Sequence, residues 1–197
     1  MKALFLVSQS PRRIELLRRF GYVFQVISPG FREENVRTGT PQLALENARG
    51  KLRGAENRGE GVYLASDTIV YIDGLILGKP ENEGEAREFL RMLSGREHHV
   101  YTGIALREHP SGEVHEELVD TLVRFKKLED EEIEFMLSND NPLDKAGAYA
   151  IQGIAGLFIE SISGSYYNVV GLPIERVYLA LRRFGVIPVP LSRSHPR

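Results

Sequence analysis

The chain has 197 residues, of which 42% are hydrophobic and 26% charged, and a formal net charge of −2. This ordinary globular composition excludes a disordered, collagen-like or coiled-coil protein, and the near-neutral charge argues against strong nucleic-acid binding. The absence of cysteine excludes disulfides, thiolate catalysis and cysteine-based metal sites. Because no apolar run approaches the roughly 18 residues of a membrane span and Met1–Val7 is too short for a signal peptide, we expect a cytoplasmic protein without membrane contact.

The first part of the chain predicts strands and helices in alternation. Apolar runs bounded by turn residues indicate strands, and apolar residues at helical spacing indicate helices. The predicted elements are a strand over 3–7, a helix capped by Ser10 and stopped at Gly21, a strand over 23–27, a polar loop over 31–40, a helix over about 40–57, and strand segments over 62–65, 68–72 and 75–77. Residues 62–72 form either two strands or one strand that is interrupted at Ser66-Asp67.

The second part of the chain also mixes the two types. The predicted elements are a helix over 83–93, strands over 100–106 and 113–125, a helix over 130–137, a loop over 139–145, strand-like segments over 148–152 and 157–162, a loop over 164–170 and a helix over 174–184. From Val186 the chain is rich in proline and arginine and is expected to be loose. This order predicts an α/β fold with a mixed sheet and flanking helices.

The segment Ser8-Gln9-Ser10-Pro11-Arg12-Arg13 joins the first strand to the first helix. Free backbone N–H groups and the positive end of the helix dipole favour an anion there. The hydroxyls of Ser8 and Ser10 add donors, and the guanidinium groups of Arg12 and Arg13 match phosphate geometry. The segment therefore predicts an oligophosphate site that is not a Walker A loop; a helix cap followed by solvated arginines remains the alternative.

Asp67 interrupts an otherwise apolar strand pattern. Burial of an ionised carboxylate without a partner is costly, so a cation or a functional role is expected at such a position. A carboxylate there could hold a divalent cation or accept a proton from water. The alternative is an aspartate that makes a turn at a strand end.

Several other polar residues carry weaker signals. Lys79, stiffened by the following proline, could contact phosphate, and Lys145 and Gln152 belong to a segment rich in small residues, where a backbone can approach a ligand closely. Glu33 and its neighbour Glu34 could bind metal. Each of these residues could instead be a solvated residue or part of a turn. Lys51 by itself is ambiguous. The five histidines show no metal-ligand spacing.

Taken together and in this order, the motifs resemble the Maf family of nucleoside triphosphate pyrophosphatases. The resemblance rests on Ser8-x-Ser10-Pro11-Arg12-Arg13-x-Glu15-Leu16-Leu17, Ala65-Ser66-Asp67-Thr68-Ile69-Val70, Gly78-Lys79-Pro80, the segment 143–153 and the segment 164–173. It implies a mixed, twisted sheet with flanking helices and two lobes around a deep cleft, as in inosine triphosphate pyrophosphatases. It also implies a single domain over 1–185, with 186–197 as the tail, and suggests a homodimer.

The resemblance implies metal-dependent hydrolysis of a nucleotide between its α- and β-phosphates. Asp67 matches the catalytic carboxylate and would bind Mg²⁺ or Mn²⁺ together with Glu33. The other matching cleft residues are Ser8, Ser10, Arg13, Lys51, Lys79 and Lys145, which would bind the triphosphate, and Arg12, Thr68 and Gln152, which stand where the subgroup acting on dTTP and UTP has its marker residues. Ser66 departs from the glycine or alanine common in relatives.

The expected mechanism requires charge neutralisation and an in-line water. Asp67 would activate the water that attacks the α-phosphorus, while Thr68 and Gln152 would contact the uracil or thymine edge. Three alternatives stay open: a pyrophosphatase for non-standard purine nucleotides, a non-catalytic nucleotide-binding regulator of cell division, and a protein in which the motif residues serve only as caps and turns.

Overall fold

The computed structural model describes residues 2–31 and 36–190. Its strands are β1 (Leu4–Val7), β2 (Gln25–Ile27), β3 (Gly61–Ile72), β4 (Leu75–Leu77), β5 (Glu97–His109), β6 (Val114–Phe125) and β7 (Ile159–Ser163). They form one sheet in the order β2-β1-β3-β5-β6-β7, and β4 also pairs with β3. β1 runs parallel to β2 and β3, whereas the other pairs are antiparallel. The predicted mixed sheet is confirmed.

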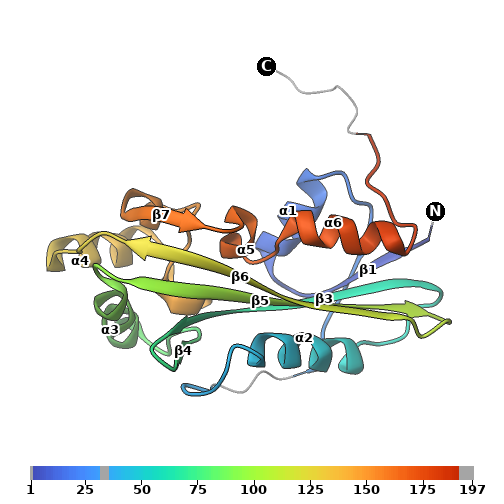
Figure 1. Ribbon diagram of the computed structural model, residues 1–197, viewed down its shortest axis with the longest axis horizontal. Helices are drawn as coiled ribbons and strands as arrows, with labels where there is room; N and C mark the ends of the chain where they lie inside the picture. Colours follow the sequence, from blue (N-terminus) through green and yellow to red (C-terminus); the bar gives the residue numbers. More distant parts are fainter. Residues whose placement is uncertain (1, 32–35, 191–197) are drawn as a thin grey trace.

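Helices cover both faces of this sheet (Figure 1). They are α1 (Pro11–Arg19), α2 (Leu43–Gly54), α3 (Glu83–Leu93), α4 (Asp130–Asn139), α5 (Tyr166–Val170) and α6 (Ile174–Arg183), with short 3₁₀ turns at Pro142–Asp144, Ala146–Ala148 and Ile154–Leu157. α2 lies on one face, while α1 and α6 lie on the other. None of the helices within the described ranges is both long and apolar enough to span a bilayer.

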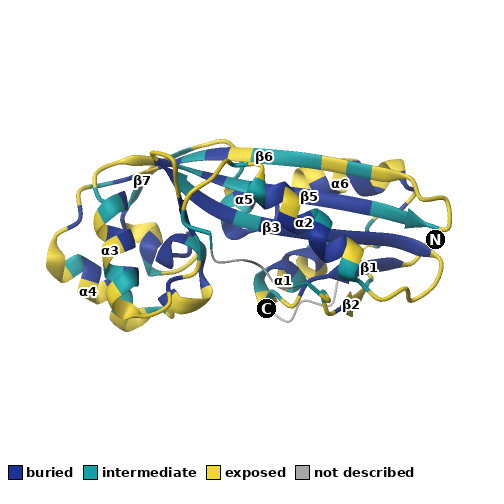
Figure 2. Cartoon of the chain, turned by 90° about the horizontal axis from the view of Figure 1, so that it is seen from below, coloured by how far each residue is buried: buried dark blue, intermediate teal, exposed yellow. Residues whose placement is uncertain are grey.

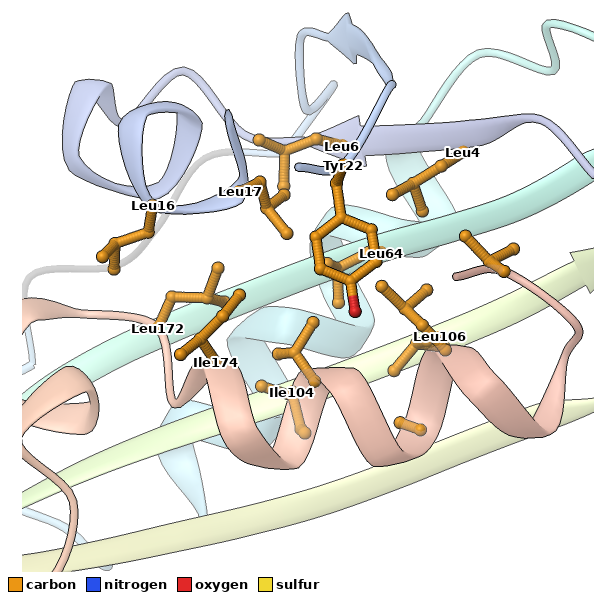
Figure 3. Packing of buried hydrophobic residues seen from close by; sticks show 14 of the residues in the cluster. Leu4, Leu6, Leu16, Leu17, Tyr22, Leu64, Ile104, Leu106, Leu172 and Ile174 are labelled. Carbon is orange, nitrogen blue, oxygen red and sulfur yellow. The ribbon is translucent and has the colours of Figure 1, made fainter. Parts of the chain in front are cut away.

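Two large apolar clusters divide the molecule into two lobes along the long strands. The first packs α1 and α6 against the sheet through residues such as Leu17, Leu64 and Leu172 (Figure 3). The second surrounds Val70 and Leu90 and joins α3 and α4 to the far end of the same strands (Figure 2). Because β3 and β5 contribute to both clusters, the lobes share one continuous sheet, and the predicted two-lobed architecture is confirmed.

The edge of β3 that faces away from β5 is covered in two separate places. β1 pairs with it at residues 62–64 and β4 at residues 70–72. On this edge, no strand among the described residues pairs with the stretch between them, which contains Asp67 and Thr68. Side chains alternate between the faces of a strand, so this gap lets residues from both faces of β3 reach one space between the lobes.

Two predictions of local structure are wrong. Residues 148–152 do not form a strand, because Gly147 and Ala148 have left-handed φ angles of 67° and 64°, which no strand can accommodate. Residues 164–170 are not an open loop: Ser165 caps α5, its hydroxyl accepting from the N–H of Asn168 at 3.1 Å. Of the two alternatives for residues 61–72, the single strand is confirmed, but Ser66 and Asp67 do not interrupt it.

The first residues after α6 pack against the rest of the protein. Val186 is buried in the first cluster, and the N–H of Val189 donates to the carbonyl oxygen of Gly21 at 2.8 Å. The predicted loose tail is therefore docked as far as Val189, because an apolar side chain and a backbone hydrogen bond hold it. The end of the predicted tail, 191–197, lies outside the described residues.

A buried histidine–tyrosine pair supports the lobe that contains α3 and α4. His98 is 1% exposed, its Nε2 lies 2.7 Å from the Tyr149 hydroxyl, and its ring stacks on Phe125. Burial, with a smaller contribution from neighbouring His99, lowers the pKa of His98 to about 3. Burial also raises the pKa of Tyr149 above its ordinary value. The pair is therefore neutral at physiological pH.

This pair predicts a loss of stability in mild acid. Below pH 6.5 the unfolded chain takes up a proton on His98 that the folded chain does not, so unfolding becomes easier as the pH falls. The contribution is about 1.4 kcal/mol per pH unit. Urea unfolding at several pH values should show this slope in the wild type and lose it in His98→Gln. Tyr149→Phe, which keeps the burial of His98, should retain the slope; a His98→Gln protein with the wild-type slope would contradict the assignment.

Candidate active site

A cavity of about 290 Å³ lies at the gap in the edge of β3, between the two lobes. Loops after β1 and β4 contribute to its wall, as ligand-binding loops commonly do beyond the carboxyl ends of strands. The predicted site residues that line it are Ser10, Arg12, Arg13, Asp67, Thr68, Lys79, Lys145 and Gln152. The structure thus brings together residues that are up to 142 positions apart, from Ser10 to Gln152.

Asp67 is held by two side chains from α2. Its Oδ1 accepts from Lys51 Nζ at 2.7 Å, and its Oδ2 accepts from Asn47 Nδ2 at 2.9 Å. Lys51 also donates to the carbonyl oxygen of Ser66 at 3.1 Å. The side chains of Lys51 and Asp67 are only 5% and 8% exposed. The charged residue that interrupts the apolar pattern of β3 is therefore one partner of a buried ion pair at the wall of the cavity. The carboxylate of Asp67 has a cationic partner there, which offsets the cost of its burial.

A glycine on the neighbouring strand lets α2 reach Asp67. Gly103 is paired directly with Asp67 in the register of β3 and β5. A Cβ atom at position 103 would lie 2.4 Å from the Cα atom of Leu45 in α2. Since any larger residue would push the helix away, the glycine sets the close approach that brings Asn47 and Lys51 to the carboxylate.

Arg13 lies in the cavity wall on the other face of β3. Its side chain is largely buried; Nε donates to the carbonyl oxygen of Gly171 at 2.9 Å, and Nη2 donates to the Thr68 hydroxyl at 3.1 Å. Gly171 has a φ of 120°, a conformation that favours glycine. The chain segment after α5 therefore orients the guanidinium group that α1 supplies.

Arg12 and Lys145 share a carboxylate, Asp144. Arg12 Nη1 lies 3.4 Å from Asp144 Oδ2, and Lys145 Nζ lies 2.7 Å from Asp144 Oδ1. Burial alone would raise the pKa of Asp144, but the hydrogen bonds and charges of Lys145 and Arg12 outweigh it and lower that pKa. Because Lys145 also pairs with Asp140 at 2.9 Å, its charge is already balanced by its own segment.

The remaining predicted residues take different places. Lys79 and Gln152 are exposed and line the cavity, which suits contacts with an incoming ligand. Ser8 is buried behind the loop, where its hydroxyl accepts from the N–H of Ser10 at 3.2 Å; it shapes the loop and does not line the cavity. Glu33, the predicted second metal ligand, lies outside the described residues.

The sequence prediction missed two contributors to the site. Asn47 precedes Lys51 by four residues, so both lie on one helix face, and that face also buries Ala44 and Ala48. A polar pair on an apolar helix face was the available signal. Thr102, fully buried beneath Thr68, gave no signal because threonine is common in strands.

Comparison with known proteins settles the family. A family profile described as "Maf-like protein" matches residues 3–184. The chain belongs to the Maf family. Its relatives include the dTTP/UTP pyrophosphatase of Carboxydothermus hydrogenoformans, which is 45% identical over 92% of this chain and 98% of that protein. The dTTP/UTP pyrophosphatase of Symbiobacterium thermophilum is 47% identical over 94% of this chain and 95% of its own.

Among solved structures, a HAM1 protein from Coxiella burnetii is 17% identical and has a TM-score of 0.47, covering 93% of this chain and 100% of its own. This likeness is too low to carry functional meaning.

The donor set of this Maf-family site suits a hard cation. Among the described residues no group of three or more histidine, cysteine, aspartate or glutamate side chains could hold a metal ion. Asp67, however, presents a carboxylate at the cavity, and Mg²⁺ is commonly bound by one or two carboxylates together with substrate phosphates. The described residues therefore fit a cation that arrives with a polyphosphate.

Proposed function

We propose that this chain hydrolyses dTTP and UTP, and modified pyrimidine triphosphates of similar shape, to the monophosphate and pyrophosphate. The names of its relatives, at 45% and 47% identity over nearly the whole chain, support this substrate class. The observation that carries the proposal is the cavity itself, where the carboxylate of Asp67 faces a space also lined by Arg12, Arg13 and Lys79. Such a reaction would remove unwanted nucleotides from the pool.

The cationic wall of the cavity binds the triphosphate. Phosphoryl transfer depends mainly on positioning and charge neutralisation. Arg13 offers a fixed guanidinium group on one face of β3, and Lys79 offers an exposed ammonium group at the mouth. The backbone at Ser10, where α1 begins, adds the positive end of a helix. Together these groups hold the β- and γ-phosphates away from Asp67.

Asp67 positions the attacking water. Its carboxylate accepts a hydrogen bond from that water and takes its proton as the water oxygen bonds to the α-phosphorus. The bond between the α-phosphorus and the bridging oxygen then breaks, and pyrophosphate leaves. Lys51 and Asn47 fix the carboxylate during this step, since each holds one of its two oxygens.

A divalent cation, Mg²⁺ or Mn²⁺, belongs to this proposal. Asp67 would hold it together with phosphate oxygens, and Glu33 is the proposed second ligand on the strength of the family resemblance. When bound, the cation neutralises charge on the phosphates and polarises the α-phosphoryl group. We expect a chelator to abolish pyrophosphate release and excess Mg²⁺ or Mn²⁺ to restore it; full activity in the chelator would contradict the requirement.

A nucleotide panel tests the substrate. Pyrophosphate release should be compared for dTTP, UTP, 7-methyl-GTP and ITP, and roughly 10-fold or greater preference for dTTP and UTP is expected. In water enriched with heavy oxygen, the label should enter the monophosphate, because the α-phosphorus is attacked. Preference for ITP would favour the purine alternative, and tight binding without any release would favour a non-catalytic regulator.

The charge of the chain bears on its partners and its location. With a net charge of −2, we propose no strong binding to nucleic acid and no membrane association, and a cytoplasmic location. We also propose a homodimer, on the family resemblance. Light scattering coupled to size exclusion would measure its mass directly.

A further inference from the structure

The side chain of Arg12 is held by a residue from the opposite lobe. Arg12 lies in the first turn of α1, whereas Asp144 ends a 3₁₀ turn that packs against α3. α1 and α3 belong to different lobes (Figure 2), and both residues line the cavity between them. Arg12 Nη1 donates to Asp144 Oδ2 at 3.4 Å, and Nη2 donates to the backbone carbonyl oxygen of Asp144 at 3.1 Å. This contact therefore joins the two lobes across the cavity.

A buried ammonium group fixes the carboxylate of Asp144. Lys145, whose side chain is only 9% exposed, donates from Nζ to Asp144 Oδ1 at 2.7 Å. The same ammonium forms an ion pair with Asp140 at 2.9 Å and donates to the carbonyl oxygen of Asn141. One oxygen of the Asp144 carboxylate is thus anchored within its own lobe, and the other oxygen accepts from Arg12.

The two adjacent arginines of α1 are therefore oriented from opposite lobes. Gly171, which accepts from Arg13, follows α5 in the same lobe as α1, while Arg12 is held from the other lobe. A guanidinium group has five N–H donors, so Arg12 can keep both contacts to Asp144 and still donate to a ligand. Ordering a long side chain upon binding costs free energy. A guanidinium group that is already held in place avoids much of this cost.

We propose that Asp144 is a positioning residue that fixes the guanidinium group of Arg12 for the bound nucleotide. This inference deepens the proposed function and rests on it, because it assigns the nucleotide to Arg12. Asp144 acts through Arg12 and does not itself contact the nucleotide. Because Asp144 belongs to the second lobe, the placement of a binding group on α1 depends on how the second lobe sits against it.

Positioning and simple charge repulsion predict opposite effects of neutralising Asp144. Its negative charge opposes a polyanion, so if charge alone mattered, Asp144→Asn would tighten nucleotide binding. If Asp144 positions Arg12, the same variant weakens binding, because the guanidinium group must then be ordered by the ligand. Asp140→Asn is the matched control: it removes the same charge beside the same ammonium group, but Asp140 pairs with Lys145 and not with Arg12.

Binding should be measured by calorimetry in Mg²⁺ with a dTTP analogue that has a methylene group between the α- and β-phosphorus atoms. This analogue cannot be cleaved at that position. We expect Asp144→Asn to weaken its binding about 3- to 10-fold, as expected for one lost hydrogen bond. Asp140→Asn should bind it at least as tightly as the wild type. In an Arg12→Ala background, Asp144→Asn should have no further effect, because its whole contribution passes through Arg12.

The chemical reactivity of Arg12 gives a second readout that needs no ligand. Phenylglyoxal modifies guanidinium groups, and an ion pair protects them. Mass spectrometry should show that Arg12 is modified several-fold faster in Asp144→Asn than in the wild type or Asp140→Asn. The rate at Arg91, which pairs with Asp130 on the surface, should stay unchanged in all three proteins. Circular dichroism should report the wild-type fold in each.

Three results would overturn the inference. Equal or tighter binding of the analogue by Asp144→Asn would mean that Asp144 acts only as a charge. A loss that persists in full in the Arg12→Ala background would mean that Asp144 contacts the nucleotide itself. Unchanged reactivity of Arg12 in Asp144→Asn would mean that the contact does not hold the guanidinium group. If the wild type does not bind the analogue, the proposed function fails, and the reactivity of Arg12 still decides whether Asp144 positions it.

Discussion

Asp67→Asn is expected to reduce pyrophosphate release from dTTP by about 10²–10⁴-fold, the usual contribution of a positioned general base. Asparagine keeps the shape of the side chain and can still contact Asn47 and Lys51. It carries no negative charge, however, so it neither accepts the proton of the attacking water nor attracts a divalent cation. Steady-state release of pyrophosphate at saturating metal would measure the loss.

The same substitution in the turn just after β3 provides a matched control. Asp73 stands at the hairpin turn after β3, with a left-handed φ of 50° that asparagine also tolerates. Its carboxylate forms an exposed ion pair with Arg96, and such surface pairs contribute little to stability. Asp73→Asn should therefore keep wild-type activity. More than a tenth of the wild-type turnover in a correctly folded Asp67→Asn protein would remove Asp67 from the mechanism.

Lys51→Met should have the largest effect on stability. The substitution leaves the carboxylate of Asp67 buried without its nearest cation, and removal of one partner from a buried pair costs about 3–5 kcal/mol. Urea unfolding monitored by circular dichroism would measure the change. Substitution of an exposed lysine, Lys127→Met, should change the free energy of unfolding by no more than about 0.5 kcal/mol.

The double variant Lys51→Met/Asp67→Asn tests the cause. Neutralising both partners removes the uncompensated charge, so much of the lost stability should return while hydrolysis stays abolished. Stability and activity would then separate, as expected if the pair is retained for chemistry. If the double variant is as unstable as Lys51→Met, the loss comes from packing of the lysine stem instead of from charge.

Local chemistry in the sequence was enough to find much of the site. A serine and a proline at the start of a helix, followed by two arginines, marked the segment 8–13, and a charged residue within an apolar strand marked Asp67. These signals are local because capping, turn formation and strand alternation each depend on neighbouring residues. The motif order also indicated the family, which the match over residues 3–184 confirmed.

Local patterns failed where backbone conformation depends on distant packing. The segment 148–152 looked like a strand, yet a Cβ atom at Gly147 would lie 2.9 Å from Val70 Cγ2. The N–H of Gly147 also donates to the carbonyl oxygen of Gly78 at 3.1 Å. The 3₁₀ turn there is thus set by its close approach to β3 and the end of β4, which no periodicity in the segment could reveal.

The amino-acid sequence by itself determined the types of residue at the site, the alternation of strands and helices and the family. Only the tertiary structure decided which partner each side chain has. It placed Asn47 and Lys51 on the carboxylate of Asp67, and it placed the hydroxyl of Thr68 beside Thr102 and the carbonyl oxygen of Gly171, up to 103 positions away. The reason is physical. A hydrogen bond forms only when the donor–acceptor distance is correct to within a few tenths of an ångström. Sheet register and the close approach of α2 to Gly103 set those distances.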